Sequence, residues 1–240
     1  CESDLGSYHA EVASILIKLG HLQVDLGYYN AAFDMYQRGL LVERAVFEEN
    51  HPNIIVTLSN IAQVHKQRGD FEAAFGLYAA IYIAQVSSVG FRHPKVALTL
   101  SNMALMYYQS KKYAPALELY QEVLCIWKET AGEDNLEVAA TLNSIGLVLY
   151  KLGDYQRALD TFIRSLHIRQ SQLDERHRDI TVNLYNIATI HVELGNNDKA
   201  MHCLKDTLRI ERDSLGNDHM DVAQTLSHIA KVHQQRGEAR

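Results

Sequence analysis

The sequence has little cysteine and proline and no long hydrophobic run. Its 240 residues include 3 Cys and 3 Pro. The cysteines are far apart, form no CxxC pair and are odd in number, so we expect a reducing, cytoplasmic setting and no disulfide framework. No run approaches the roughly 18 apolar residues of a membrane span, and the N-terminus does not resemble a signal peptide. We therefore expect no membrane partner.

An excess of positive charge is also missing. The formal net charge is −6, and the basic residues are not clustered with aromatic residues in one stripe. Nucleic acid is therefore not an expected partner. The chain is 47% hydrophobic and 22% charged, which is the composition of an ordinary globular protein.

Catalytic and metal-binding motifs are absent as well. The sequence contains no HExxH, GxGxxG, GxxxxGK[ST] or GxSxG. We therefore predict that the chain is not an enzyme and holds no cofactor or metal. Cys125 and Cys203 fall at apolar positions and are predicted to be buried, inert thiols. Five histidines recur at one interval in the loops between repeats, where we expect capping or packing: His9, His51, His93, His177 and His219.

A period of 42 residues is the main feature that is present. The stretch HPNIIVTLSNIAQVHKQRGDF begins at His51, HPKVALTLSNMALMYYQSKKY at His93, and NLEVAATLNSIGLVLYKLGDY at Asn135. One column is leucine in all six copies: Leu16, Leu58, Leu100, Leu142, Leu184 and Leu226. Such self-similarity predicts a repeat protein.

Further columns give each copy its local structure. A column of small residues contains Gly20, Ala62, Ala104, Gly146, Ala188 and Ala230, and a turn column contains Gly27, Gly69, Lys111, Gly153, Gly195 and Gly237. An alanine column follows at Ala32, Ala74, Ala116, Ala158 and Ala200, and a bulky one at Tyr36, Tyr78, Tyr120, Phe162 and Leu204. Apolar residues at i, i+3, i+4 and i+7 before the turn predict one helix, and those after it predict a second.

Each copy is therefore an antiparallel helix pair with a close approach at the small column. Pro52 and Pro94 suit a first helical turn, and Asp134 and Asp218 are predicted helix N-caps. Stacked pairs predict an all-α fold, a right-handed α-solenoid forming one domain over 1–240. Its predicted repeats are approximately 9–50, 51–92, 93–134, 135–176 and 177–218, with a partial sixth repeat over 219–240.

The columns of small, turn, alanine and bulky residues resemble the tetratricopeptide repeat (TPR), and the period resembles the kinesin light chain subclass. Ser110-Lys111-Lys112 departs from the glycine turn of the other copies. The resemblance implies a protein-interaction scaffold or cargo adaptor that binds short linear peptides in a concave groove. Kinesin light chains are similar in selecting acidic, tryptophan-bearing motifs, which makes an acidic peptide the expected partner.

A polar column beside the leucine column supplies the candidate binding residues. Its members are Lys18, Asn60, Asn102, Ser144, Asn186 and His228, and Asn143 adjoins Ser144. In the resembling family an asparagine here holds peptide main chain, a role that we carry to Asn60, Asn102 and Asn186. The alternative interpretation is a set of solvated residues, or of residues that hydrogen-bond between helices.

Charge and aromatic residues complete the predicted groove. Four cations (Lys18, Lys66, Lys151 and Lys231) oppose two acids (Asp25 and Glu193), which favours an acidic ligand unless the lysines form a solvated face. Tyr108, Tyr150, Leu105, Leu147 and Val56 are predicted to hold an apolar anchor.

Two other functions stay open at this point. One is a self-associating scaffold, because the end of a solenoid exposes an apolar face, here predicted at Ile229, Ala230 and Val232. The other is a peptide-sensing regulatory domain of a larger signalling protein or enzyme.

Overall fold

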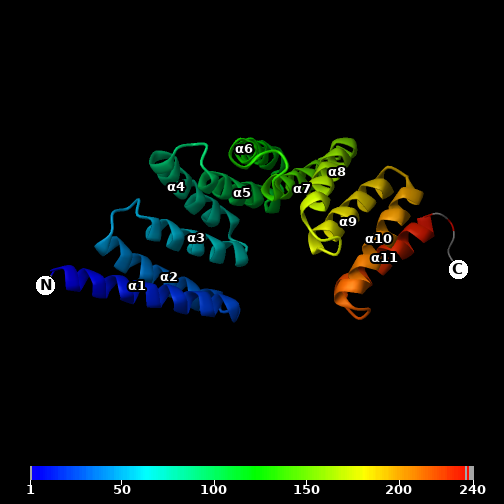
Figure 1. The fold of residues 1–240 in the computed structure, drawn as a ribbon. Coiled ribbons are helices and arrows are strands. Elements are labelled where there is room, and N and C mark those ends of the chain that lie inside the picture. Colours follow the sequence, from blue (N-terminus) through cyan, green and yellow to red (C-terminus); the bar gives the residue numbers. More distant parts are fainter. Residues whose placement is uncertain (1, 236, 238–240) are drawn as a thin grey trace. The chain divides into compact units, whose positions relative to one another are not determined.

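The computed structural model describes residues 2–235 and 237, with side chains from residue 9 onward. Cys1 and the end of the predicted sixth repeat (236 and 238–240) lie outside the described residues. The described residues form α-helices and no β-strand (Figure 1). The helices are α1 (Glu2–Asp25), α2 (Tyr29–Val46), α3 (Pro52–Gln67), α4 (Phe71–Val89), α5 (Pro94–Gln109), α6 (Tyr113–Ala131), α7 (Leu136–Lys151), α8 (Tyr155–Gln172), α9 (Arg178–Glu193), α10 (Asn197–Leu215) and α11 (Met220–Gln235).

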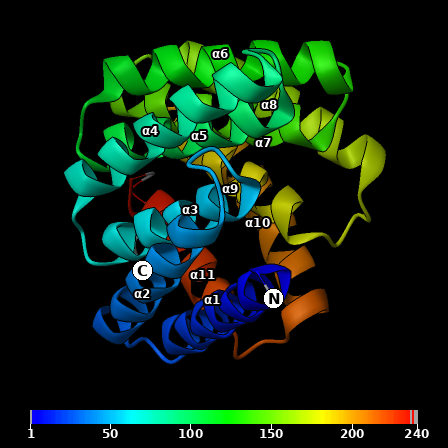
Figure 2. The same cartoon turned by 90° about the vertical axis from the view of Figure 1, so that its left-hand side faces the viewer.

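The chain divides into two compact units, residues 1–126 and residues 127–240. In unit 1, α1 packs against α2, α2 against α3, α3 against α4 and α4 against α5, and Figures 1 and 2 show α1, α2 and α3 side by side. In unit 2, α7 to α11 pack in the same sequential way. Odd-numbered helices are the first member of each predicted pair and even-numbered helices the second.

Most pairs begin after a side chain that caps the first helix. At His51, His93, His177 and His219, Nδ1 accepts a hydrogen bond of 3.1–3.2 Å from the backbone N–H two residues on. Asn135 caps α7 in the same way, at 2.7 Å. The predicted caps Asp134 and Asp218 are therefore wrong by one residue, because the cap column holds Asn135 and His219. His9 lies inside α1 instead of in a loop.

The turn column requires a left-handed backbone at every copy. The φ values are 78° at Gly27, 79° at Gly69, 60° at Lys111, 81° at Gly153, 72° at Gly195 and 71° at Gly237. Glycine adopts this conformation without steric cost, which explains its recurrence at the end of the first helix. Lys111 adopts it too, so the third pair keeps the turn without glycine.

The small column lies where the two helices of a pair come closest. A Cβ added at Gly20 would lie 2.5 Å from the ring of Tyr36, and one at Gly146 would lie 2.7 Å from the ring of Phe162. Ala62, Ala104 and Ala188 are fully buried at the same position. The bulky column of the second helix thus fills the space that the small column leaves.

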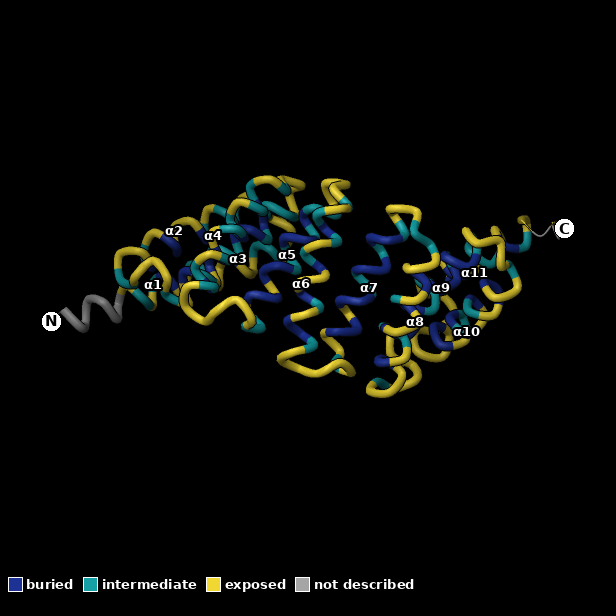
Figure 3. The backbone as a smooth tube through the Cα atoms, turned by 90° about the horizontal axis from the view of Figure 1, so that it is seen from above, coloured by how far each residue is buried: buried dark blue, intermediate teal, exposed yellow. Residues whose placement is uncertain are grey.

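Burial follows the helix faces that pack on neighbouring helices, and Figure 3 shows exposed residues in the connecting turns. Trp127 is buried, whereas Cys125 is exposed and its predicted burial is wrong. Cys203 is half-buried, and burial raises the pKa of its thiol. Val232 also corrects a prediction, because it is buried against α10 in a cluster with Ala188 and Leu204.

Candidate functional site

Unit 1 contains an apolar crevice between the N-terminal halves of α3 and α5. The second helix of the pair, α4, lines it with Tyr78, Gln85 and Val89. Its volume is about 480 Å³. Cavities of this size with mainly apolar walls and a few polar groups are typical ligand sites.

The two walls of this crevice present apolar side chains that no other helix covers. Val56 on α3 is 55% exposed and Leu98 on α5 is 52% exposed, and both line the crevice. Lys95 and Asn102 line it from α5, so a cation and an amide lie on the same wall. The sequence prediction included Val56 and Asn102 but missed Lys95 and Leu98.

A crevice at the equivalent position lies in unit 2, between α9 and α11. It is smaller, about 140 Å³, and its lining includes counterparts three repeats further along the chain. Val182 corresponds to Val56, but Asp221 replaces Lys95 and Gln224 replaces Leu98. The same place in the fold is therefore apolar with a cation in unit 1, and polar with acidic groups in unit 2.

A buried column on the second helices, polar in four of its five members, distinguishes the successive repeats. Its members are Glu43, Gln85, Trp127, Arg169 and Glu211, and opposite them on the next helix lie Thr57, Thr99, Thr141, Asn183 and Thr225. The Thr99 hydroxyl donates to Gln85 Oε1 at 2.8 Å, and the Arg169 guanidinium donates to the Asn183 side chain. Arg169 Nη2 also lies 3.6 Å from Asp179 Oδ2. Our sequence reasoning missed this column because its members differ in type, although their 42-residue spacing is the same.

Asn102 and Asn60 occupy different surroundings in unit 1. Asn102 Nδ2 donates to the Leu98 carbonyl at 3.1 Å, within its own helix, and the residue borders the crevice. The Nδ2 atom of Asn60 is buried and has no hydrogen-bond partner among the described residues. Lys18, in the same column, is exposed on α1.

In unit 2 the same column makes contacts between helices. Asn186 Nδ2 donates to Asn143 Oδ1 at 3.0 Å, whereas the Ser144 hydroxyl donates to the Ala140 carbonyl. The His228 ring lies 4.8 Å from the Tyr185 ring. Burial, and then the charge of Lys231, lower the pKa of His228. Asn186 lines the α9–α11 crevice, so Asn102 and Asn186 each border a crevice.

The other predicted groove residues do not line either crevice. Burial lowers the pKa of Lys66, and burial followed by the nearby Tyr113 raises the pKa of Tyr108. Lys151 Nζ lies 5.3 Å from the Tyr150 ring centre, and the Tyr150 hydroxyl donates to Glu193 Oε1. Lys151 and Lys231 are exposed. A role in peptide binding stays a prediction for all of these residues.

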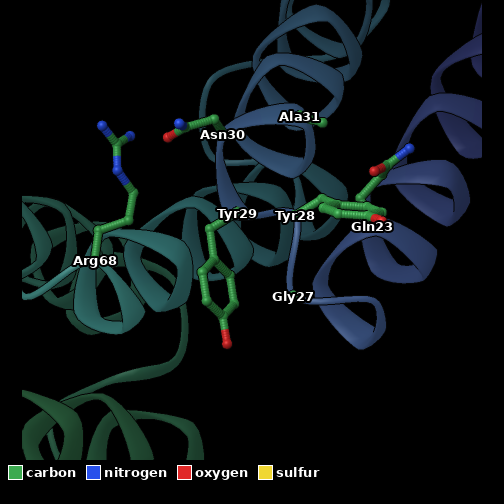
Figure 4. A pocket seen from close by; sticks show the side chains of 7 residues that line it. All are labelled: Gln23, Gly27, Tyr28, Tyr29, Asn30, Ala31 and Arg68. Carbon is green, nitrogen blue, oxygen red and sulfur yellow. The ribbon is translucent and has the colours of Figure 1, made fainter.

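Another hollow, of about 620 Å³, lies at the turn between α1 and α2. Figure 4 shows Tyr28 and Tyr29 beside Gly27, with Arg68 at the end of α3. The side chains of Tyr29 and Arg68 extend in opposite directions in this view, so they do not converge on one ligand position. None of the predicted site residues lines this hollow.

Two histidines outside the cap column, His65 and His191, belong to helix packing. His65 lies edge-on to Phe33 at 5.1 Å, and His191 is buried. Burial, and then Lys199, lower the pKa of His191. Within the part of the chain that the structure describes, no group of three His, Cys, Asp or Glu residues is placed to hold a metal ion. No described helix is both long and apolar enough to cross a membrane.

The first helix carries an uncovered apolar stripe. Its members are Ile15, Leu19 and Leu22, and Leu26 follows directly after the helix; all of them are exposed. At the other end of the chain, Leu226 and Ala230 are exposed on α11, whereas the predicted Val232 is not. Self-association through the solenoid ends stays a prediction, with α1 offering the more apolar face.

Stacked antiparallel helix pairs with uncovered crevices between the first helices define a repeat protein of the binding-scaffold class. The chain belongs to the tetratricopeptide repeat family, which matches residues 11–82, 95–171 and 179–240. The predicted family is thereby confirmed. Tetratricopeptide repeats bind protein or peptide partners, so the chain is a protein-interaction scaffold. No curated protein sequence matches it.

Solved structures show the same fold. BtubC (BKLC) from P. vanneervenii is 23% identical, with a TM-score of 0.74 over 90% of this chain and 91% of that one. A putative kinesin light chain from Podosopora anserina with nearly identical TPR-like repeats is 16% identical, with a TM-score of 0.72 over 86% and 98%. The apo form of RapI is 15% identical, with a TM-score of 0.72 over 93% and 64%. The prediction of an all-α solenoid of TPR type is confirmed.

Proposed function

We propose that this scaffold binds a short acidic peptide through the α3–α5 crevice of unit 1. One bulky apolar side chain of the peptide inserts between Val56 and Leu98. Asn102 holds the peptide main chain, and Lys95 attracts its acidic residues. The observation that carries this proposal is the exposure of Val56 and Leu98 on facing walls of one 480 Å³ crevice.

Burial of an apolar anchor supplies most of the binding free energy in this arrangement. Interfaces depend on a few anchors in desolvated pockets, whereas charges at the rim mainly increase the association rate and the specificity. The Asn102 amide has a donor and an acceptor and so suits an extended backbone. Asn60, one repeat earlier, and Asn186, two repeats later, are proposed to have the same role. A single flexible peptide loses conformational entropy on binding, which favours micromolar affinity.

The experiment is a fluorescence anisotropy titration with acidic nonapeptides that each carry one Trp, Phe or Leu. Val56→Glu is expected to weaken binding at least about tenfold, because it places a charge in the anchor position. Asn102→Ala is expected to weaken binding of every peptide, and Lys95→Glu to remove most of the preference for acidic residues. Val182→Glu, the counterpart of Val56 in unit 2, is the matched control and should bind like the wild type. Equal binding by the wild type and Val56→Glu would exclude this crevice.

A further inference from the structure

The α9–α11 crevice of unit 2 contains a buried carboxylate without a full set of partners. Glu211 lines the crevice from α10 and is only 7% exposed. Its Oε2 atom is buried and accepts no hydrogen bond from any described residue. Burying a carboxylate is costly unless it is paired or hydrogen-bonded, so this oxygen is placed to accept a donor from a ligand.

Three further groups converge on the same crevice. Asp221 adds a second carboxylate from α11, and Tyr185 and Asn186 add an aromatic ring and an amide from α9. The Tyr185 ring packs against His228, which fixes its orientation. Arg178 also borders the crevice, but it is 74% exposed and its Nη2 lies 3.7 Å from Asp221 Oδ2. This exposed contact involves Asp221 and leaves the Glu211 Oε2 atom without a partner among the described residues.

We propose that the α9–α11 crevice binds the arginine side chain of a peptide partner. The guanidinium is a planar fork of N–H donors that pairs with carboxylates and stacks on aromatic rings, and the crevice contains both. Its volume of about 140 Å³ suits such a head group, since a water molecule occupies about 30 Å³. The inference rests on the proposed function only in that a peptide supplies the arginine, and it concerns a different crevice.

The equivalent crevice of unit 1 shows why the ligand is cationic. Gln85 stands where Glu211 stands, and it is already satisfied by the Thr99 hydroxyl at 2.8 Å. Lys95 stands where Asp221 stands, and it would repel a guanidinium. Both differences add negative charge in unit 2, and they outweigh the single positive charge that Arg178 adds in place of Pro52. A cation is therefore favoured there and an anion is disfavoured. Lysine offers only a point charge and is expected to bind more weakly than arginine.

Release of a proton from Glu211 is a second measurable consequence of arginine binding. Burial is the main cause that raises the pKa of Glu211, and the charge of Asp221 raises it further. The Thr225 hydroxyl and His219 lower this pKa and so partly oppose the change. Tyr185 and Arg178 face the same crevice from α9. A bound guanidinium stabilises the ionised carboxylate and so lowers its pKa. Arginine binding at mildly acidic pH is therefore expected to release a proton from Glu211.

The test is an NMR titration of the ¹⁵N-labelled chain with N-acetyl-arginine amide, with N-acetyl-citrulline amide as the uncharged probe. We expect saturable shifts in α9, α10 and α11 with the arginine probe, and weaker or no shifts with citrulline. Glu211→Gln should weaken binding at least about tenfold. Asp221→Asn should weaken it about two- to fivefold, as for an exposed ion pair. Calorimetry in two buffers of different ionisation enthalpy measures the released proton.

The chain supplies matched controls for these variants. Gln85 shows that glutamine is accommodated at this position, so Glu211→Gln should remain folded, which its unfolding curve checks. Glu43→Gln makes the same change in unit 1 and should leave arginine binding unchanged. Equal arginine affinity in the wild type and Glu211→Gln, or equal shifts with citrulline, would overturn the proposal. Neither result depends on the α3–α5 crevice, whose own test uses Val56→Glu.

Discussion

Gly146 and Gly20 lack a Cβ because an aromatic ring occupies its place. At Gly146 the added atom would lie 2.7–2.9 Å from three ring atoms of Phe162. Gly76 on α4 is the opposite case, since a Cβ there would meet nothing within 4 Å. Gly20 and Gly146 are therefore required by packing, whereas Gly76 has no steric role.

Gly146→Ala is expected to destabilise the fold by about 1–3 kcal/mol, because the Phe162 ring must shift within a packed interface. Gly76→Ala is expected to stabilise it by about 0.5–1 kcal/mol, because alanine loses less conformational entropy in a helix. Urea unfolding of both variants beside the wild type measures these differences. If Gly146→Ala were as stable as the wild type, the close approach would not restrict this column.

The capping residues show how far single positions could be predicted. Aspartate is a strong N-cap in general, and this preference led to Asp134 and Asp218. The 42-residue register points instead to the column of His51, His93, Asn135, His177 and His219, whose side chains do accept the backbone N–H. Position within the repeat was therefore more informative than residue propensity.

At the scale of the elements, four of the second helices (α2, α4, α8 and α10) carry a buried polar side chain against the next helix. Glu43 is 2% exposed, and burial raises its pKa, while the Thr57 hydroxyl and His51 partly oppose the change. A carboxyl with a raised folded-state pKa favours the folded chain when protonated. This stabilisation is complete below the unfolded-state value of about 4.3 and is lost as pH rises through the folded-state pKa.

Glu43→Gln should therefore be more stable than the wild type at neutral pH, by about 1 kcal/mol, because it removes the cost of a buried charge. The difference should shrink as pH falls toward 4.3. Glu211 is present in both the wild type and Glu43→Gln. Subtracting their two pH–stability curves therefore gives the contribution of Glu43 alone. Gln85→Glu is the reverse control and should introduce a pH dependence of the same sense. A difference that stays constant from pH 4.5 to 8 would contradict this account.

The helix pairs were predictable from the sequence, whereas the crevices were not. Pairing follows from what the copies share: the small column, the turn column and the bulky column. The character of each crevice follows from what they do not share, such as Lys95 against Asp221 and Gln85 against Glu211. Comparing copies for sameness therefore finds the fold and overlooks the residues that distinguish one binding position from another. Asn102 and Asn186 could be predicted because they belong to a repeated column and also line a crevice.

For the whole chain, the two units carry binding positions of opposite preference. Unit 1 offers an apolar crevice with Lys95, and unit 2 offers a polar crevice with Glu211 and Asp221. If one partner uses both crevices, it carries an acidic, apolar segment and a separate arginine.

A bivalent peptide tests this directly. Linking the acidic segment to an arginine through Gly-Ser spacers of increasing length should give tighter binding than the acidic segment alone, with an optimum where the spacer matches the span between the crevices. The gain arises because the second contact becomes intramolecular and has a high effective concentration. Glu211→Gln should abolish the gain and leave the affinity of the acidic segment unchanged, whereas Val56→Glu should weaken every peptide in the series. If no spacer length improves on the acidic segment, the two crevices do not serve one peptide.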